Sequence, residues 1–435
     1  MICIECVRPE SLKRLISEKG ANHMCRYCGK DSTAVDSAFL FDFILDLAVE
    51  NTAARDELSQ YEDWMTFDGG SDEIAVADLG VVLAEWMDLG DETYFNDLYK
   101  YAPNALKFDQ TGVNDRLYFE DHGSLDGNLY DAKWEMFVAD IRHSHRFFNP
   151  TAKTFLDSVF TFLSSAGGAL KPECIRVMGK GDELYRARSA STYQDAKKIA
   201  DDPVRQLGPT PKDRASSQRM TPNGISALYC ALERKTCLSE IRAITGDNVV
   251  SIAMSPVSQL RLLDLTKLGQ VEQPGLTLLD KGYRDALHLK TFVSSLVKKM
   301  SKPRGRNDEL SYLSTQIVFE YLRLRFDSQV DGLIFPSVQT GEQGTNAVLF
   351  PEASVISSKN YRMLDDYQMA EMAEPDFDSD EEEPFEDEAK LYCIPGSLRF
   401  HKVTAIETKA EEYTHIVELF MTPLDRKRMG LEPLF

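Results

Sequence analysis

The sequence has no long uninterrupted hydrophobic run, and this absence excludes several classes of protein. The best apolar stretch, residues 38–49, is interrupted by two aspartates, so we expect no membrane-spanning helix. The first residues include Cys3 and Cys6 but lack the basic start and apolar segment of a secretory signal. We therefore expect a protein that stays in the cytoplasm and does not bind membranes.

Positive charge is also scarce. The 435 residues include 49 Lys and Arg against 70 Asp and Glu, which gives a net charge of −21. Because nucleic acids are bound by clustered Lys and Arg, this balance argues against nucleic acid as the main partner. Residues 371–388 alone hold eleven Asp and Glu and no Lys or Arg. We interpret residues 365–390 as an acidic, disordered insertion.

Four of the eight cysteines form two spaced pairs near the start of the chain. Two residues separate Cys3 from Cys6 and Cys25 from Cys28, and eighteen residues lie between the pairs. This spacing is typical of a four-cysteine zinc site, and a full set of thiolate ligands indicates a structural zinc. We assign residues 1–33 to this zinc knuckle. The alternative is four free thiols.

The remaining cysteines are scattered singly among apolar residues, at Cys174, Cys230, Cys237 and Cys393. Buried free thiols are the ordinary interpretation of such a pattern, and they agree with a cytoplasmic location.

Residues 34–170 are predicted to form an all-α domain. Phe39, Phe43 and Leu47 recur at helical spacing, and residues 74–89, 131–148 and 151–163 show similar periodicity. Pro150 suits the first turn of a helix.

From residue 173 onwards, short β-rich runs alternate with helical patterns, which predicts a mixed α+β domain over 173–425. The β-rich runs are 174–178, 183–187, 225–232, 248–254, 261–265, 332–335 and 347–350, and further runs follow at 397–406 and 413–420. Residues 201–217 contain three prolines and are predicted to form a loop over the site. The runs after the acidic segment are expected to rejoin the same sheet.

Three polar residues, Arg186, Glu240 and Ser337, stand in or beside apolar runs of this region. A polar side chain in such a setting costs free energy unless a partner satisfies it, which indicates a site. In order and surroundings these segments resemble the RES domain, a family named for the three residue types. The resemblance implies a fold like that of ADP-ribosyltransferases and an enzyme that destroys NAD.

Further segments carry the same resemblance. Residues 218–224 resemble the family's Gly-Arg-aromatic-Asn loop, with Gln218 in place of the glycine, and they contribute Arg219 and Asn223. Tyr229 lies in the strand that follows, and Asn346 lies in the strand after Ser337. We expect these four residues, Arg219, Asn223, Tyr229 and Asn346, to bind the dinucleotide. Residues 311–316 resemble the family's Thr-Gln helix start and are suited to N-capping.

The resemblance implies cleavage of the bond between nicotinamide and ribose. Arg186, Glu240 and Ser337 would be catalytic: Glu240 stabilises positive charge on the ribose, Arg186 holds the pyrophosphate or an attacking phosphate, and Ser337 orients the ribose or the nucleophile. Inorganic phosphate is a co-substrate if the reaction is phosphorolysis, and water attacks if it is hydrolysis. The alternatives are ADP-ribosyl transfer to a macromolecule, and a catalytically silent platform that acts through protein binding.

The helical region before this domain resembles the HEPN-type domains that accompany some RES proteins. Many HEPN domains are ribonucleases that use an Arg and a His on one helix, and Arg116 and His122 have a similar spacing here. Their segment reads as a loop, so we expect a scaffold that serves oligomerisation or regulation. The resemblance also implies a toxin or defence effector, an antitoxin or regulatory protein as partner, and a homo-oligomer.

Overall fold

A computed structural model describes most of the chain as two compact units, which are treated separately below. The first unit holds Met1–Trp134 and Glu272–Phe292, and the second holds Glu135–Val271 and Val293–Glu411. The described residues are 1–59, 63, 67, 74–123, 128–165, 167–271, 275–301, 310–341, 343–358 and 388–405. The predicted acidic insertion and the predicted strand at 413–420 therefore lie outside the described residues, apart from residues 388–390.

The first unit begins with a small antiparallel sheet and one helix. Strands β1 (Ile2–Cys3), β3 (Asp31–Val35) and β2 (Ala21–Met24) lie in that order. A short 3-10 turn (Ile4–Cys6) and helix α1 (Glu10–Lys19) connect the first two strands in the chain. Leu12 and Ile16, one turn apart on α1, are fully buried in the same apolar cluster as Ile2, Leu40 and Tyr94, so this segment shares the core of the first unit.

The rest of the first unit is only partly helical. Its helices are α2 (Ser37–Asn51), α4 (Leu79–Val81) with a π-helical continuation (Val82–Trp86), α5 (Phe95–Tyr101) and α6 (Asn104–Lys107). Between them lies an antiparallel sheet in the order β4 (Ala53–Ala54), β6 (Leu117–Phe119) and β5 (Val76–Asp78). The prediction of an all-α domain is therefore wrong.

The predicted helix over 74–89 shows why. The Asp78 carboxylate accepts a 3.1 Å hydrogen bond from the Val81 backbone N–H and caps the helix, which therefore begins at Leu79. The residues before this cap are extended and pair with Leu117–Phe119. Arg116, beside that strand, forms ion pairs with Asp56 and Glu57, and His122 is exposed. This pairing gives Arg116 a structural role.

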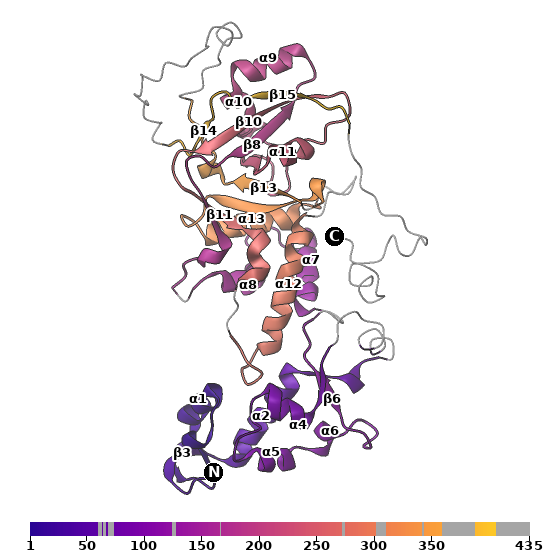
Figure 1. Cartoon of the computed structure of the whole chain (residues 1–435), viewed down its shortest axis with the longest axis vertical. Coiled ribbons are helices and arrows are strands. Elements are labelled where there is room, and N and C mark those ends of the chain that lie inside the picture. The colour runs from indigo at the N-terminus through magenta and orange to yellow at the C-terminus, as the bar shows by residue number, and fades with distance from the viewer. Residues whose placement is uncertain are drawn as a thin grey trace. The chain divides into compact units, whose positions relative to one another are not determined.

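The second unit begins with helices that precede its sheet. Helix α7 spans Leu129–His143 and belongs to the second unit from Glu135 onwards, and α8 spans Pro150–Phe160. Pro150 occupies the first turn of α8 as predicted, and the Asn149 side chain caps it by accepting from the Ala152 N–H. Helix α8 lies beside α13 (Leu313–Arg325; Figure 1). Phe160 stacks on Tyr321 where the two helices meet. The two compact units thus divide near Trp134, whereas the predicted domain boundary lies at 170.

A nine-stranded mixed sheet forms the centre of the second unit (Figure 1). All its pairings are antiparallel except that between β11 and β12. All seven β-rich runs predicted before the acidic segment overlap a strand. The strands, in the order that they occupy in the sheet, are β14 (Leu391–Cys393), β10 (Asn248–Pro256), β8 (Leu184–Ser189), β9 (Leu228–Ala231), β13 (Gly344–Leu349), β12 (Gly332–Ser337), β11 (Leu260–Asp264) and β7 (Ile175–Met178), with β15 (Arg399–Lys402) also paired with β10.

Helices join these strands. They are α9 (Tyr193–Asp201), α10 (Pro203–Leu207), α11 (Arg234–Glu240), α12 (Tyr283–Ser301) and α13, and α12, like α7, is divided between the two units. The predicted loop over 201–217 contains α10, because Pro203 fits its first turn and Asp202 caps it. Strand β15 confirms that the chain rejoins the sheet after the acidic segment. Among the described residues, no helix is both long enough and apolar enough to cross a membrane.

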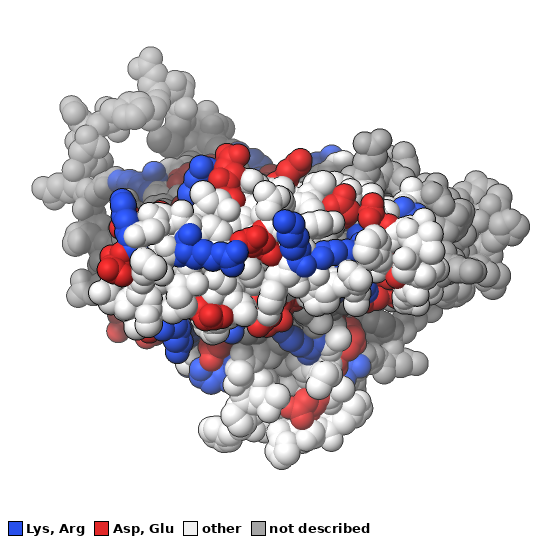
Figure 2. All heavy atoms as spheres, turned by 90° about the horizontal axis from the view of Figure 1, so that it is seen from below, with Lys and Arg blue, Asp and Glu red and all other residues white. Residues whose placement is uncertain are grey.

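Charges of both signs mix on the surface drawn in Figure 2. Lys and Arg alternate there with Asp and Glu, and the described residues of this face form no continuous basic area. Nucleic-acid backbones are bound by clustered cations, so this face lacks the character of such a surface.

Candidate active site

A cavity of about 390 Å³ opens in the second unit, beside strands β8, β9 and β13 and helix α11. Five of the predicted site residues line it: Arg186, Arg219, Tyr229, Glu240 and Asn346. Ser337 and Asn223 do not line the cavity, but Ser337 is hydrogen-bonded to Glu240, which does. The fold therefore brings together residues that are spread over about 160 positions of the sequence.

Glu240, the last residue of α11, is held by two donors from the sheet. The Ser337 hydroxyl donates to its Oε1 at 2.5 Å, and the Asn346 amide donates to the same oxygen at 2.6 Å. Ser337 is fully buried and Asn346 nearly so. Within the described part of the chain, no group donates to the second oxygen, Oε2. The carboxylate is thus oriented by one oxygen while the other stays available to a ligand.

The sheet register explains why these groups meet. Strands β12 and β13 are antiparallel neighbours, and Phe335 is paired with Asn346 while Ser337 is paired with Gly344. Helix α11 packs closely on β13 at Gly344, where any side chain would overlap Thr236. Because α11 ends at this residue, Glu240 is exposed as a whole, and only its carboxylate is held against the sheet.

Arg186 lies in the middle of β8 and bridges two strands. Strands β8 and β9 pair only through Tyr185 and Ala231, and beside this pair the Arg186 Nη1 donates to the Tyr229 carbonyl at 2.5 Å. Burial lowers the pKa of Arg186. No carboxylate among the described residues forms an ion pair with it. A half-buried cation whose described partner is a neutral carbonyl favours the binding of an anion.

Residues in the first turn of α13 hold the loop that carries Arg219 by hydrogen bonds. The Gln316 side-chain amide donates to the carbonyls of Gln218 and Thr221, at 2.7 and 3.2 Å, and the Thr315 hydroxyl donates to the Arg219 carbonyl at 2.6 Å. The Arg219 guanidinium lies over the ring of Tyr312, 5.9 Å from its centroid. These contacts fix the loop at the edge of the cavity.

Tyr229 also belongs to this support. Its hydroxyl accepts a 3.0 Å hydrogen bond from the Met220 N–H and lies 3.2 Å from the Thr221 hydroxyl, and burial raises its pKa. Asn223 is exposed, and its side-chain oxygen accepts from the Ser217 N–H. Both side chains thus hold the loop in the structure, and their contact with a dinucleotide remains a prediction.

Two features of this site were not predicted from the sequence. Residues 311–316 were expected to provide an N-cap, but α13 begins at Leu313, so Tyr312 occupies that position without a side-chain hydrogen bond. Thr315 and Gln316 bind the Arg219 loop instead. Arg242 lines the cavity two residues after Glu240. Its nearness to Glu240 in the sequence is the signal that could have identified it.

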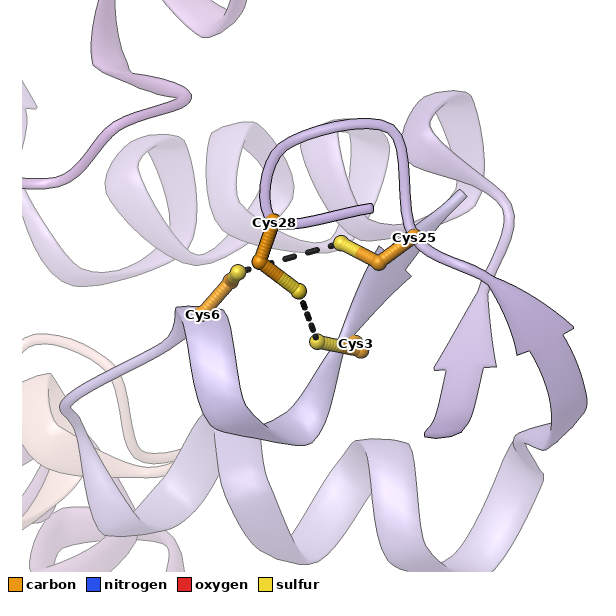
Figure 3. A group of neighbouring side chains, drawn as sticks. All are labelled: Cys3, Cys6, Cys25 and Cys28. Atoms are coloured by element: carbon orange, nitrogen blue, oxygen red, sulfur yellow. Dashed lines mark hydrogen bonds between the residues drawn. The ribbon is translucent and has the colours of Figure 1, made fainter. Parts of the chain in front are cut away.

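The four predicted zinc ligands lie together in the first unit (Figure 3). The sulfur atoms of Cys3, Cys6, Cys25 and Cys28 are within 4.8 Å of one another. Cys3 Sγ lies 3.6 Å from Cys28 Sγ, and Cys25 Sγ lies 3.8 Å from Cys6 Sγ. Zn–S bonds of about 2.3 Å in a tetrahedron place sulfur atoms about 3.8 Å apart, so the cluster fits a tetrahedral metal ion.

The residues that line the cavity lie in a segment that matches a known protein family. Residues 183–366 match the family model described as RES domain. The six predicted residues of the cavity and its loop, together with Ser337, all lie inside this range. A search of curated proteins found no match. The matched segment supports a RES domain in this chain, which is consistent with an enzyme that acts on NAD.

Proposed function

We propose that this protein degrades NAD by cleaving the bond between nicotinamide and ribose. One observation carries the proposal: the Glu240 carboxylate, oriented by Ser337 and Asn346, lines the same cavity as Arg186, a half-buried cation. The Glu240 carboxylate can stabilise a positive charge that develops on the substrate, and the Arg186 guanidinium can bind a phosphate. Cleavage of NAD requires both, because positive charge develops on its ribose and its pyrophosphate is anionic.

Cleavage of this bond requires mainly electrostatic stabilisation from the protein. The bond between the ribose carbon and the nicotinamide nitrogen breaks, and its electron pair stays on the nitrogen, so nicotinamide leaves as a neutral molecule. The ribose carbon gains positive charge, which the Glu240 carboxylate stabilises. Oxygen from phosphate or from water then bonds to that carbon, and an attacking water releases one of its protons to solvent. No strong general acid is required, and no histidine lines the described cavity.

The cationic side chains have the geometry for the rest of the substrate. Arg186 and Arg219 line the cavity, and guanidinium groups bind phosphate oxygens in pairs. We assign the pyrophosphate to these two residues. Phosphorolysis and hydrolysis both agree with this arrangement, and so does ADP-ribosyl transfer, since donor binding would be the same.

The remaining features complete the proposal. The RES domain would share the ADP-ribosyltransferase fold, and residues 34–170 would serve as a scaffold for oligomerisation or regulation, in keeping with the structural role of Arg116. An enzyme that consumes NAD harms its own cell, so we propose a toxin or defence effector that is restrained by an antitoxin or regulatory protein, and that assembles as a homo-oligomer. Cys3, Cys6, Cys25 and Cys28 would hold a structural zinc ion.

Product analysis tests the catalytic proposal directly. The full-length protein is incubated with NAD in the presence and absence of phosphate. Nicotinamide with ADP-ribose-1-phosphate identifies phosphorolysis, free ADP-ribose identifies hydrolysis, and a labelled macromolecule identifies transfer. Unchanged NAD contradicts the proposal and favours a binding platform.

A matched pair of variants assigns the activity to the cavity. Glu240→Gln keeps an acceptor for Ser337 but removes the charge, so we expect turnover to fall by about 100-fold or more. Glu352→Gln removes a carboxylate that pairs with Arg323 elsewhere in the same unit, and it should leave turnover unchanged. Full activity in Glu240→Gln would remove Glu240 from the mechanism.

A further inference from the structure

The backbone of Arg242 has a left-handed conformation, which residues other than glycine rarely adopt. Helix α11 ends at Glu240, Ile241 caps it, and Arg242 follows with φ at +54°. The Arg242 N–H donates to the Ser239 carbonyl at 3.2 Å, which closes the helix end. Glycine normally occupies such a left-handed position after a helix, because it has no Cβ to clash. An arginine there holds strain, and strain of this kind clusters at functional sites.

The left-handed turn brings Arg242 to the cavity. Both Glu240 and Arg242 line it, although they are only two residues apart. Arg242 is exposed, and no ion pair within the described part of the chain involves it. Its guanidinium is therefore available at the mouth of the cavity.

The charges around the cavity are opposite to the character of the chain. Three arginines line it, Arg186, Arg219 and Arg242, against one carboxylate, Glu240. The whole chain, in contrast, has a net charge of −21. A local excess of positive charge in a concave site attracts anions that carry more than one negative charge.

We propose that Arg242 binds a phosphate group of the ligand at the mouth of this cavity. Its planar fork matches two phosphate oxygens, and its position next to Glu240 places that phosphate close to the reacting ribose. This inference rests on the proposed function. The phosphate group belongs either to the dinucleotide or to free inorganic phosphate, and both present the same oxygens to the guanidinium.

The experiment measures binding separately from turnover. Calorimetric titration of the full-length protein with ADP and with inorganic phosphate is compared among wild type and three variants. Arg242→Gly removes the guanidinium and relieves the left-handed strain, Arg242→Lys keeps a charge without the fork, and Arg176→Gln removes an exposed charge on β7 that does not line the cavity.

We expect Arg242→Gly to weaken binding of ADP, of phosphate, or of both by about tenfold or more, as the loss of a charge-assisted contact should. Its thermal midpoint should not fall, because glycine suits the turn. Arg242→Lys should lie in between, and Arg176→Gln should match wild type. A weaker affinity for ADP alone assigns the phosphate to the dinucleotide, and a weaker affinity for phosphate alone assigns it to the free anion.

Two results overturn the inference: equal binding in Arg242→Gly and Arg176→Gln, or no binding of either probe to wild type. Failure of the proposed function is seen separately. If wild type binds the probes but leaves NAD unchanged, the catalytic proposal fails, and the comparison of variants still decides the role of Arg242.

Discussion

The Ser337 hydroxyl donates a 2.5 Å hydrogen bond to Glu240 Oε1, and this contact joins the end of a buried strand to the end of a helix 97 residues earlier in the chain. Asn346 donates to the same oxygen. The two donors restrain the carboxylate from the side of the sheet. Its position therefore depends on the pairing of β12 with β13, and not on α11 alone.

The first prediction concerns this contact. Ser337→Ala should lower kcat by about tenfold or more, because a hydrogen bond to a charged group contributes about 1.5–3 kcal/mol. Nicotinamide release in Ser337→Ala, Glu240→Gln and the double variant gives a mutant cycle. We expect strong non-additivity, since both residues act through one contact. Ser354→Ala is the control, because Ser354 is nearly as buried but its hydroxyl bonds only to backbone groups, accepting from the Leu228 N–H and donating to the Leu349 and Phe350 carbonyls. Independent effects of the two substitutions would contradict the relationship.

The close approach of α11 to β13 gives a second prediction. A methyl group on Gly344 would overlap Thr236 Oγ1 and lie 2.8 Å from its Cγ2, so Gly344→Ala should reduce the free energy of unfolding by about 1–3 kcal/mol. It should also lower turnover, because the displaced helix carries Glu240. Thr236→Ala in the same chain removes two of the three clashing atoms, leaving Thr340 Oγ1 at 2.9 Å, and should restore part of each loss. Gly179→Ala, at a position with open space, should change neither denaturant midpoint nor rate.

A third prediction addresses the cysteine cluster. Protein purified without chelator should contain about one zinc ion per chain by elemental analysis, and Cys28→Ser should lose it, because three remaining thiolates leave the tetrahedron incomplete. The thermal midpoint of the first unit should fall with the metal, since the cysteines join segments 22 residues apart. Cys174→Ala removes a buried thiol outside the cluster and should keep the zinc. Metal-free wild-type protein would reject the assignment.

The fourth prediction is a dependence on pH at β15. Ser251 accepts from Arg234 Nη1 and lies 2.8 Å from His401 Nε2, so its own hydrogen is free to bind a neutral imidazole. Burial, together with Arg234 and Arg399, lowers the pKa of His401. As the pH falls, His401 is therefore protonated in the unfolded chain first, near pH 6.5, and in the folded chain only at a lower pH. The contribution of neutral His401 is present above this pH and is lost as the pH falls below it.

Hydrogen exchange measures that loss. Protection of backbone amides in β10 and β15 is compared between wild type and His401→Gln at the same pH, so that intrinsic exchange rates cancel. The difference between them should be largest at pH 8 and should shrink towards pH 5. A difference that stays constant over this range would show that the titration of His401 does not affect the strand.

Local patterns predicted local structure well. Pro150 marked the start of a helix, and the spacing of Cys3, Cys6, Cys25 and Cys28 predicted a cluster, because both depend on neighbours in sequence. The helix expected over 74–89 failed at Asp78, where extended residues pair with a strand near residue 118. Apolar periodicity carries no information on such a distant partner.

The sequence predicted which residues belong to the site better than it predicted how they are arranged. Arg186 and Glu240 line one cavity, and Ser337 reaches it through a hydrogen bond. That Ser337 and Asn346 share one oxygen of Glu240 follows from the β12–β13 register, which a single sequence does not specify. The same is true of the loop at Arg219, whose position depends on Gln316, almost a hundred residues later.

The residues on either side of the acidic segment are joined to each other. Ser357 N–H donates to the Leu391 carbonyl at 2.7 Å, and Ile356 forms a bridge with Leu391. Strands β14 and β15 then continue along β10. A single protease cut anywhere between these anchors would therefore leave both fragments attached through the sheet, so that the nicked protein would elute as one species from a sizing column and separate only in denaturant.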